Sequence, residues 1–297
     1  MSIRRISIAA VASAAAVVTI TAVAQAMNFG AWSPAVNAES IPGTSGNLNT
    51  GALEGCPFVA QRDDVLYFAS NRTGGRGGLD IWYAVRGANG AWGDPVNFAE
   101  VNSPADDFCP TAHRNGKTFL FVSSRPGGCG RDDIYATRLH ATRGWSQPVN
   151  LGCVVNSAAN EASPYLLETE LYFSSTRTGS GDIYVSPFDG ESFGVPVLAP
   201  GLNTDAGEFR PNLRRDGLEI FFDSNRPGGI GGPDLWTSTR ASTSDPWSSP
   251  TNLGSDVNSR ANELRPSLSW DGTTLYFGST RTGGEGSQDI YVTKRSN

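Results

Sequence analysis

Five copies of one motif recur along the chain, and their regular spacing limits the possible folds more than any other feature. Each copy reads Phe-x-Ser-x-Arg, followed by a glycine-rich gap and then by Asp-Ile/Leu-Tyr/Trp. The copies begin at Phe68, Phe121, Phe173, Phe222 and Phe277, and their aspartates are Asp80, Asp133, Asp182, Asp234 and Asp289. A period of about 50 residues indicates a repeat architecture, in which each unit is one supersecondary element.

Each repeat is predicted to form four short strands. The first strand starts at a proline, and pairs such as Asn115-Gly116 and Asp216-Gly217 predict the tight turn that follows it. The second strand ends in the Phe-x-Ser segment, the third carries Asp-Ile-Tyr, and the fourth opens with an aromatic residue. Four-stranded units repeated radially form a β-propeller. The expected fold is therefore all-β, a five-bladed β-propeller over residues 27–297.

The two ends of the propeller sequence are complementary. Residues 32–37 have the pattern of a fourth strand, although no first, second or third strand precedes them. The last repeat supplies a third strand over residues 289–294 and no fourth strand. We therefore expect the N-terminal strand to complete the last blade, an arrangement that hides sheet edges.

Residues 1–26 have the features of a signal peptide. Arg4 and Arg5 precede an apolar run over residues 6–23, and residues 24–26 form an Ala-x-Ala cleavage site. An uncleaved anchor is the alternative, because the apolar run is nearly long enough to span a bilayer. The cleavage site favours export, so we expect a periplasmic or secreted protein with no stable membrane insertion after cleavage.

Charge and cysteine content restrict the partners and the compartment. The formal net charge of −6 argues against a nucleic-acid partner. Four cysteines, an even number in an exported chain, suggest two disulfides. Cys56 and Cys109 occupy the same position in neighbouring repeats, and Cys129 and Cys153 lie in loops expected on one face. The predicted pairs are Cys56–Cys109 and Cys129–Cys153.

The repeat resembles a known family at this level of detail. Phe121 to Tyr135 reads Phe-x-Ser-x-Arg-Pro-Gly-Gly-x-Gly-x-x-Asp-Ile-Tyr, which is similar to the WD-like repeat of TolB-type β-propellers. The resemblance covers essentially all of the chain after the signal peptide. It implies a propeller fold and an envelope or secreted setting.

One acid in each repeat lies three residues before the proline that opens the first strand. These acids are Glu54, Asp107, Glu161, Glu208 and Glu263, and they are expected to ring the mouth of the central channel. Pairing with the repeated arginines is the favoured interpretation, and a bound Ca²⁺ ion is the alternative. No other metal or cofactor is expected.

Function is most readily sought where the repeat changes. Arg210 and Arg265 stand where the first three repeats have Cys56, Cys109 and Ser163, and the third repeat has a short loop between Arg177 and Asp182. Together with Glu208, Glu263, Trp236 and Asp223, the two arginines could form a polar pocket with an aromatic wall. Such a pocket suits a carbohydrate or an acidic ligand, so the five acids, Arg210 and Arg265 are the candidate ligand-binding residues.

Two functions are compatible with these patterns. The preferred one is a non-catalytic binding or scaffold module for an envelope or extracellular protein or glycan. No unrepeated acid stands in a distinctive context, and His113 and His140 are expected on the opposite face, which disfavours a Ser-His-Asp triad or a histidine zinc site. The alternative is a glycoside hydrolase or lyase, with Glu208 and Glu263 as its catalytic carboxylates.

Overall fold

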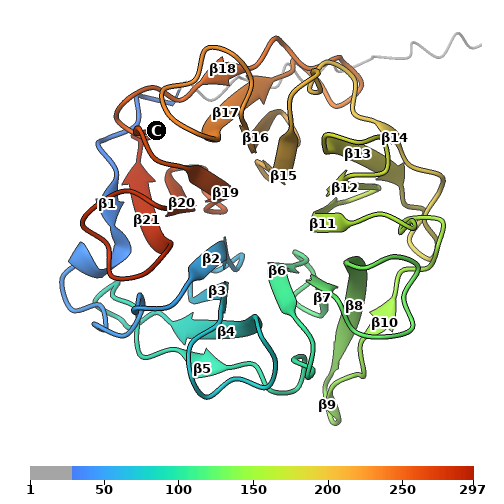
Figure 1. The fold of residues 1–297 in the computed structure, drawn as a ribbon, viewed down its shortest axis with the longest axis horizontal. Coiled ribbons are helices and arrows are strands. Elements are labelled where there is room, and N and C mark those ends of the chain that lie inside the picture. Colours follow the sequence, from blue (N-terminus) through green and yellow to red (C-terminus); the bar gives the residue numbers. More distant parts are fainter. Residues whose placement is uncertain (1–28) are drawn as a thin grey trace, which may run out of the picture.

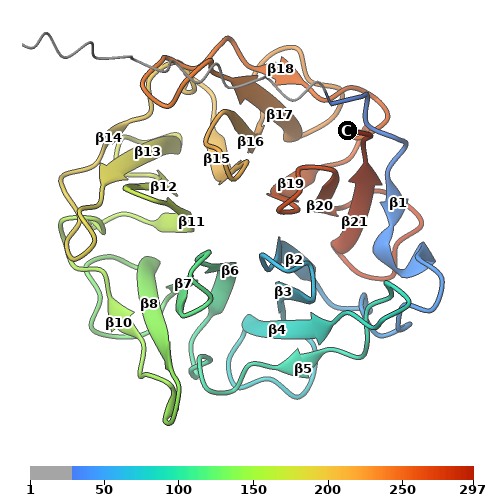
Figure 2. The same cartoon turned by 180° about the vertical axis from the view of Figure 1, so that it is seen from behind.

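The computed structural model describes residues 29–297 and has the predicted five-bladed propeller fold (Figures 1 and 2). The predicted signal peptide, residues 1–26, lies outside the described residues. Five antiparallel sheets stand around one axis, and each has its first strand innermost. The second blade has one extra short strand, β9, which pairs with the end of β8.

The strand bounds follow the repeat closely. Blades one and two contain β2 (Glu54–Val59), β3 (Val65–Ser70), β4 (Asp80–Val85) and β5 (Val96–Asn97), then β6 (Asp107–Ala112), β7 (Thr118–Ser123), β8 (Asp133–His140), β9 (Gly144–Trp145) and β10 (Val149–Asn150). Blades three and four contain β11 (Glu161–Leu167), β12 (Glu170–Ser175), β13 (Asp182–Pro187) and β14 (Val197–Leu198), then β15 (Glu208–Leu213), β16 (Glu219–Ser224), β17 (Asp234–Thr239) and β18 (Thr251–Asn252). Blade five contains β19 (Glu263–Leu268), β20 (Thr274–Ser279), β21 (Asp289–Lys294) and β1 (Val36–Asn37), and a 3-10 turn, η1 (Ala38–Ser40), follows β1.

The hydrophobic core is divided into layers between neighbouring blades. The motif phenylalanine of each second strand is fully buried. At the junction of blades five and one, Phe68 and Leu66 pack with Tyr276 and Ile290. Because the second strands are covered on both faces, they are almost continuously apolar, as in Phe119–Val122. Full burial of a side chain of this size stabilises the fold by about 1.5–3 kcal/mol.

The aromatic residue that opens each fourth strand packs against the preceding blade. Trp92 of blade one lies edge-on to Tyr276 of blade five, with ring centroids 6.0 Å apart. Trp32 of blade five lies edge-on to Phe221 of blade four at 5.9 Å. These contacts join neighbouring blades. The aromatic residue of the fourth-strand pattern therefore serves to pack one blade against the next.

The N-terminal strand closes the ring as expected. Strand β1 pairs antiparallel with β21, with Val36 opposite Val292 and Asn37 opposite Tyr291. Figure 1 shows β1 as the outermost strand of the blade that also contains the C-terminal strand β21. The first and last segments of the propeller are therefore held in one sheet.

Removal of this closing segment should destabilise the protein strongly. Deletion of residues 28–40, or Trp32→Ala alone, is expected to lower the free energy of unfolding, the single substitution by about 3 kcal/mol, because Trp32 fills the layer between blades four and five. Urea denaturation of a protein spanning residues 27–297 measures the change. Val36→Ala, at an exposed position of the same strand, is the matched control and should lie within about 0.5 kcal/mol of wild type. Equal midpoints for the truncated and full chains would contradict the closure.

Both expected disulfides are present. Cys56–Cys109 joins the innermost strands of blades one and two, and Cys129–Cys153 joins two loops of blade two. Among the described residues, no helix is long and apolar enough to cross a membrane.

Candidate functional site

The five repeated acids do not form an open ring at the channel mouth. All five are fully buried inside their own blades. In blade five, Glu263 accepts hydrogen bonds from the Ser259 amide and hydroxyl, the Ser279 hydroxyl and Arg281 Nη2, at 2.7 to 3.0 Å. Glu208 makes the same set of contacts in blade four, ending on Arg226 at 3.1 Å. Each carboxylate is therefore neutralised by its own arginine.

The repeated arginines likewise make stacking contacts and ion pairs inside their own blades. Arg125 stacks over Phe121 and Tyr135, with its guanidinium carbon 5.1 Å from each ring centroid, and it donates to Asp107 at 2.6 Å. The corresponding arginine makes the same pair of stacking contacts and the same ion pair in every blade. The motif thus builds blades, and Glu208 and Glu263 have no open face to offer to a substrate.

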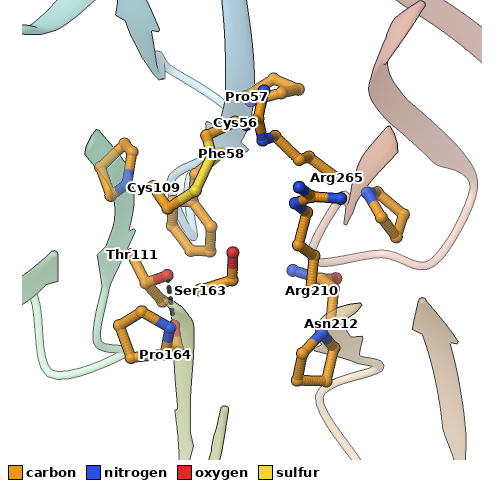
Figure 3. A pocket seen from close by; sticks show the side chains of 13 residues that line it. Cys56, Pro57, Phe58, Cys109, Thr111, Ser163, Pro164, Arg210, Asn212 and Arg265 are labelled. Atoms are coloured by element: carbon orange, nitrogen blue, oxygen red, sulfur yellow. Dashed lines mark hydrogen bonds between the residues drawn. A yellow bond between two sulfur atoms is a disulfide. The ribbon is translucent and has the colours of Figure 1, made fainter. Parts of the chain in front are cut away.

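Five other residues, one in each blade, reach the axis of the propeller. They are Cys56, Cys109, Ser163, Arg210 and Arg265, and each has a left-handed backbone conformation with φ between 47° and 62°. Each precedes the proline of its innermost strand, where the pairing register shifts. Figure 3 shows their side chains converging on the channel. Left-handed non-glycine residues cost backbone energy and often mark functional positions.

A buried aspartate connects the two arginines of this ring. Asp223 is 1% exposed and accepts from Arg210 Nη1 at 2.6 Å and from the backbone N–H of Arg265 at 2.9 Å. Burial raises the pKa of Asp223, and the two arginines oppose that rise only in part. The equivalent residues of the other blades are Ala69, Val122, Ser174 and Gly278. Contrary to the sequence-based expectation, an unrepeated acid does stand in a distinctive context.

Asp223 lines a pocket of about 420 Å³ that also contains a second carboxylate. The pocket lies between the loops of blades three and four, and Phe209 and Arg210 form part of its wall. Asp205 lies at its exposed rim, together with Asn225. The lining combines the Phe209 ring, with the Arg210 guanidinium stacked over it at 5.4 Å, and carboxylate and amide groups. This combination is suited to a sugar, which presents both an apolar ring face and hydroxyl groups.

The short loop of blade three makes room for this aromatic wall. A Cβ atom at Gly181 would lie 2.1 Å from the Phe209 ring, and one at Gly207 would lie 2.6 Å from it. Gly181 also has a φ of 101°, which other residues rarely adopt. Any side chain at Gly181 would push Phe209 out of its place. The irregular loop noted in the sequence is therefore part of the pocket.

The structure assembles only part of the pocket expected from the sequence. Arg210 and Asp223 line it, while Arg265 reaches the adjoining channel. Trp236 is buried beneath Arg226 within the blade, so the aromatic wall is Phe209 instead. Asp205 was not foreseen, although its position is occupied by Gly51, Pro104, Ala158 and Arg260 in the other blades. A comparison of every repeat position would have shown that it is unique.

A larger cavity, of about 590 Å³, opens at the rim between blades two and three. On the second strand of blade two, the residue before the motif phenylalanine is Leu120, whereas the other blades have tyrosine or phenylalanine there. The aromatic residue before the fourth strand of blade three is Phe193, whereas the other blades have tryptophan. Phe188 stacks on Phe193 at 4.6 Å. The smaller residues leave the layer incompletely filled. This cavity has one carboxylate, Glu191, so it is less suited to glycoside hydrolysis than the Asp223 pocket.

Filling this layer should stabilise the protein. Phe193→Trp restores the residue of the other blades and is expected to raise the free energy of unfolding by about 0.5–2 kcal/mol, as cavity-filling substitutions commonly do. Denaturant titration measures the difference. The reciprocal control, Trp247→Phe, removes the same volume between blades three and four and should destabilise. A less stable Phe193→Trp variant would show that the cavity cannot accept the larger ring.

Metal binding stays a prediction from the sequence. Within residues 29–297, no three histidine, cysteine, aspartate or glutamate side chains are grouped so that they could hold a metal ion. Elemental analysis of the purified protein would test the suggested Ca²⁺ ion directly.

Comparison with known proteins adds evidence about the fold. Neither a protein-family model nor a curated protein sequence matches this chain. A thermostable family-43 glycoside hydrolase superposes with a TM-score of 0.58 at 13% identity, covering 85% of this chain and 92% of that one. An α-L-arabinofuranosidase from Lactobacillus brevis gives 0.56 at 15% identity, covering 88% and 94%. A putative TolB from Agrobacterium tumefaciens gives 0.52 at 16% identity, covering 85% and 78%. At such low identities the likeness shows a shared fold.

These neighbours correct the functional preference drawn from the sequence. The expected non-catalytic binding or scaffold module is not favoured, because the similar structures are mostly glycoside hydrolases of families 43 and 62, including arabinofuranosidases and an endo-arabinanase. The TolB-type resemblance is matched at the level of the propeller only.

Proposed function

We propose that this protein is a carbohydrate-active enzyme that hydrolyses glycosidic bonds in the Asp223 pocket. The single observation that carries the proposal is an unrepeated, buried carboxyl group, with a raised pKa, facing a pocket that holds a second and exposed carboxylate. Glycoside hydrolysis uses such a pair, one group as proton donor and the other as base or nucleophile. The fold shared with family-43 and family-62 hydrolases supports the same choice.

The two carboxyl groups have environments that suit different roles. Burial favours the protonated form of Asp223, so this group donates a proton to the departing glycosidic oxygen. Asp205 is exposed and acts as the second carboxylate, activating water or stabilising positive charge on the sugar ring. Phe209 offers an apolar surface to the sugar, and Arg210 orients Asp223 by donating a 2.6 Å hydrogen bond to it from Nη1. Glu208 and Glu263, the carboxylates expected from the sequence, are replaced in these roles.

The setting and origin of the enzyme are part of the proposal. Export to the periplasm or the extracellular space is supported by the two disulfides, which persist in oxidising compartments. An envelope or extracellular glycan is then the partner. Descent of the blades from a TolB-type repeat is supported by the motif and by the TolB structure of similar shape.

The first test is turnover on a panel of glycans. We expect reducing sugar to be released from at least one of arabinan, arabinoxylan and xyloglucan, or aryl alcohol from an aryl α-L-arabinofuranoside. The panel starts from the structural neighbours, which include an arabinofuranosidase, an endo-arabinanase and a family-43 protein of a xyloglucan locus. A folded, disulfide-bonded protein with no turnover on these substrates or on acidic polysaccharides would contradict the proposal.

A further inference from the structure

The axial channel carries more positive charge than its surroundings neutralise. Arg210 and Arg265 both line it (Figure 3), close enough for the charge of Arg210 to disfavour that of Arg265. Asp223 is the carboxylate that faces the pair. The nearby Glu208 and Glu263 are already committed to Arg226 and Arg281. The two guanidinium groups therefore face at most one negative charge, and at least one positive charge is left without a partner.

Hydrogen-bond donors at the same place are also unsatisfied. Arg265 Nε and the Ser163 hydroxyl are buried and have no hydrogen-bond partner. Arg265 Nη1 donates to Gln288 Oε1 at 3.2 Å, so its head group is held in place while Nε stays free. Buried polar groups in native proteins are almost always paired with protein, water or an ion. Both residues line a space of about 30 Å³ at the axis, together with Arg210 and the Cys56–Cys109 disulfide.

Arg265 is half-buried, and its positive charge is only partly compensated by the protein. Burial, and then repulsion by Arg210, lower the pKa of Arg265 to about 9. Arginine nevertheless keeps its proton in proteins. A buried cation that keeps its charge is stabilised by an anion in contact with it. Water in this space would satisfy the free donors without compensating the charge.

We propose that this channel binds one small monovalent anion, chloride in size and charge, between the guanidinium groups of Arg210 and Arg265 and the hydroxyl of Ser163. A space of about 30 Å³ between these side chains suits a small monatomic anion better than a polyatomic carboxylate. The anion balances the second guanidinium charge and accepts from the two free donors. It also explains why the two axial arginines stand next to each other, where like charges would otherwise repel.

Bromide substitution and anion-dependent stability test the site. The Tm of the mature protein should rise in a saturable way with chloride, by roughly 5–10 °C at 100 times the Kd. Gluconate at equal ionic strength, an organic anion much larger than chloride, should give no such rise. A crystal soaked in bromide should show an anomalous peak between Arg210, Arg265 and Ser163. The same Tm curve in both salts, or no peak at the axis, would overturn the proposal.

Variants assign the effect to the channel. Arg265→Leu removes the surplus charge and should abolish the chloride dependence. Ser163→Ala, which keeps both arginines, should shift the curve to higher chloride concentration and provides the test if Arg265→Leu fails to fold. Arg138→Gln, at an exposed position, should leave the curve unchanged. An unchanged curve in Ser163→Ala and Arg265→Leu would refute the site. None of these measurements uses a glycan, so the outcome is independent of the proposed hydrolysis.

Discussion

Asp223→Ser is expected to reduce glycoside turnover by a factor of about 10²–10⁴, the range that a positioned general acid contributes. Serine is the residue of blade three at this position, where the Ser174 hydroxyl accepts from the backbone N–H of Arg210 at 3.0 Å. The substitution can therefore keep the equivalent hydrogen bond to Arg265 and removes the acid itself. Steady-state kinetics on the best substrate of the panel measures the loss.

A pH profile separates loss of the acid from loss of shape. In wild type, kcat should fall as pH rises through the raised pKa of Asp223, because the proton donor is then ionised. The serine variant should lack this limb. Substrates with a good leaving group, such as a nitrophenyl glycoside, need less protonation and should recover part of the lost rate. A variant as active as wild type, or one whose kcat still falls in the same way at high pH, would show that Asp223 is not the general acid.

The same carboxyl group links stability to pH with a definite sign. Its pKa is raised in the folded protein, so its contribution to stability is complete below the unfolded value and is lost as pH rises through the folded value. The wild-type protein should therefore lose stability relative to Asp223→Ser over that interval. Comparing how the free energy of unfolding of the two proteins changes with pH needs no substrate. A difference of this sign would confirm that Asp223 titrates in the folded protein.

The repeat allowed the fold to be predicted in full, whereas the site could be predicted only in part. Blade number, strand order and ring closure follow from residues that recur, since a residue needed to build each blade must appear in each blade. The Cys56–Cys109 pair follows from one equivalent position in two neighbouring repeats, and the Cys129–Cys153 pair follows from two loops on one face. The site depends on residues that occur once, such as Asp223 and Asp205. Arg210 and Arg265 were noticed because they interrupt an otherwise regular position. Asp223 is the first variable residue of a Phe-x-Ser-x-Arg motif. Because the residues on both sides of it are repeated, nothing in the pattern marks it as different from the same position in other blades.

The burial of the repeated acids could not be read from their spacing. The sequence places Glu54 and its equivalents at the start of the innermost strands, near the channel mouth. Whether such a side chain points to the axis or into the blade depends on the left-handed residue two positions later, which shifts the register. That conformation is unusual for cysteine, serine or arginine, and no local sequence signal predicts it. The side chains at the axis are consequently those of the left-handed residues.

Removal of a repeated acid should cost far more stability than removal of any surface charge. Glu54→Ala leaves the guanidinium of Arg72, the Ser70 hydroxyl and the Thr50 amide without their shared acceptor in the interior of blade one. Breaking a buried ion pair from one side typically costs about 3–5 kcal/mol, because the remaining charge is uncompensated. Glu168→Ala, which breaks the exposed pair with Arg114, should cost about 1 kcal/mol or less.

A double-mutant cycle shows what this pair contributes. Arg72→Met together with Glu54→Ala removes both charges, and should be less destabilising than the sum of the single substitutions. Glu208→Ala should cost about as much as Glu54→Ala, because the two blades use the same contacts on opposite sides of the ring. If Glu208→Ala loses more turnover than folded protein, Glu208 would instead belong to the active site. Equal destabilisation in both blades, with turnover lost only through Asp223, would separate the residues that build the propeller from those that act on the glycan.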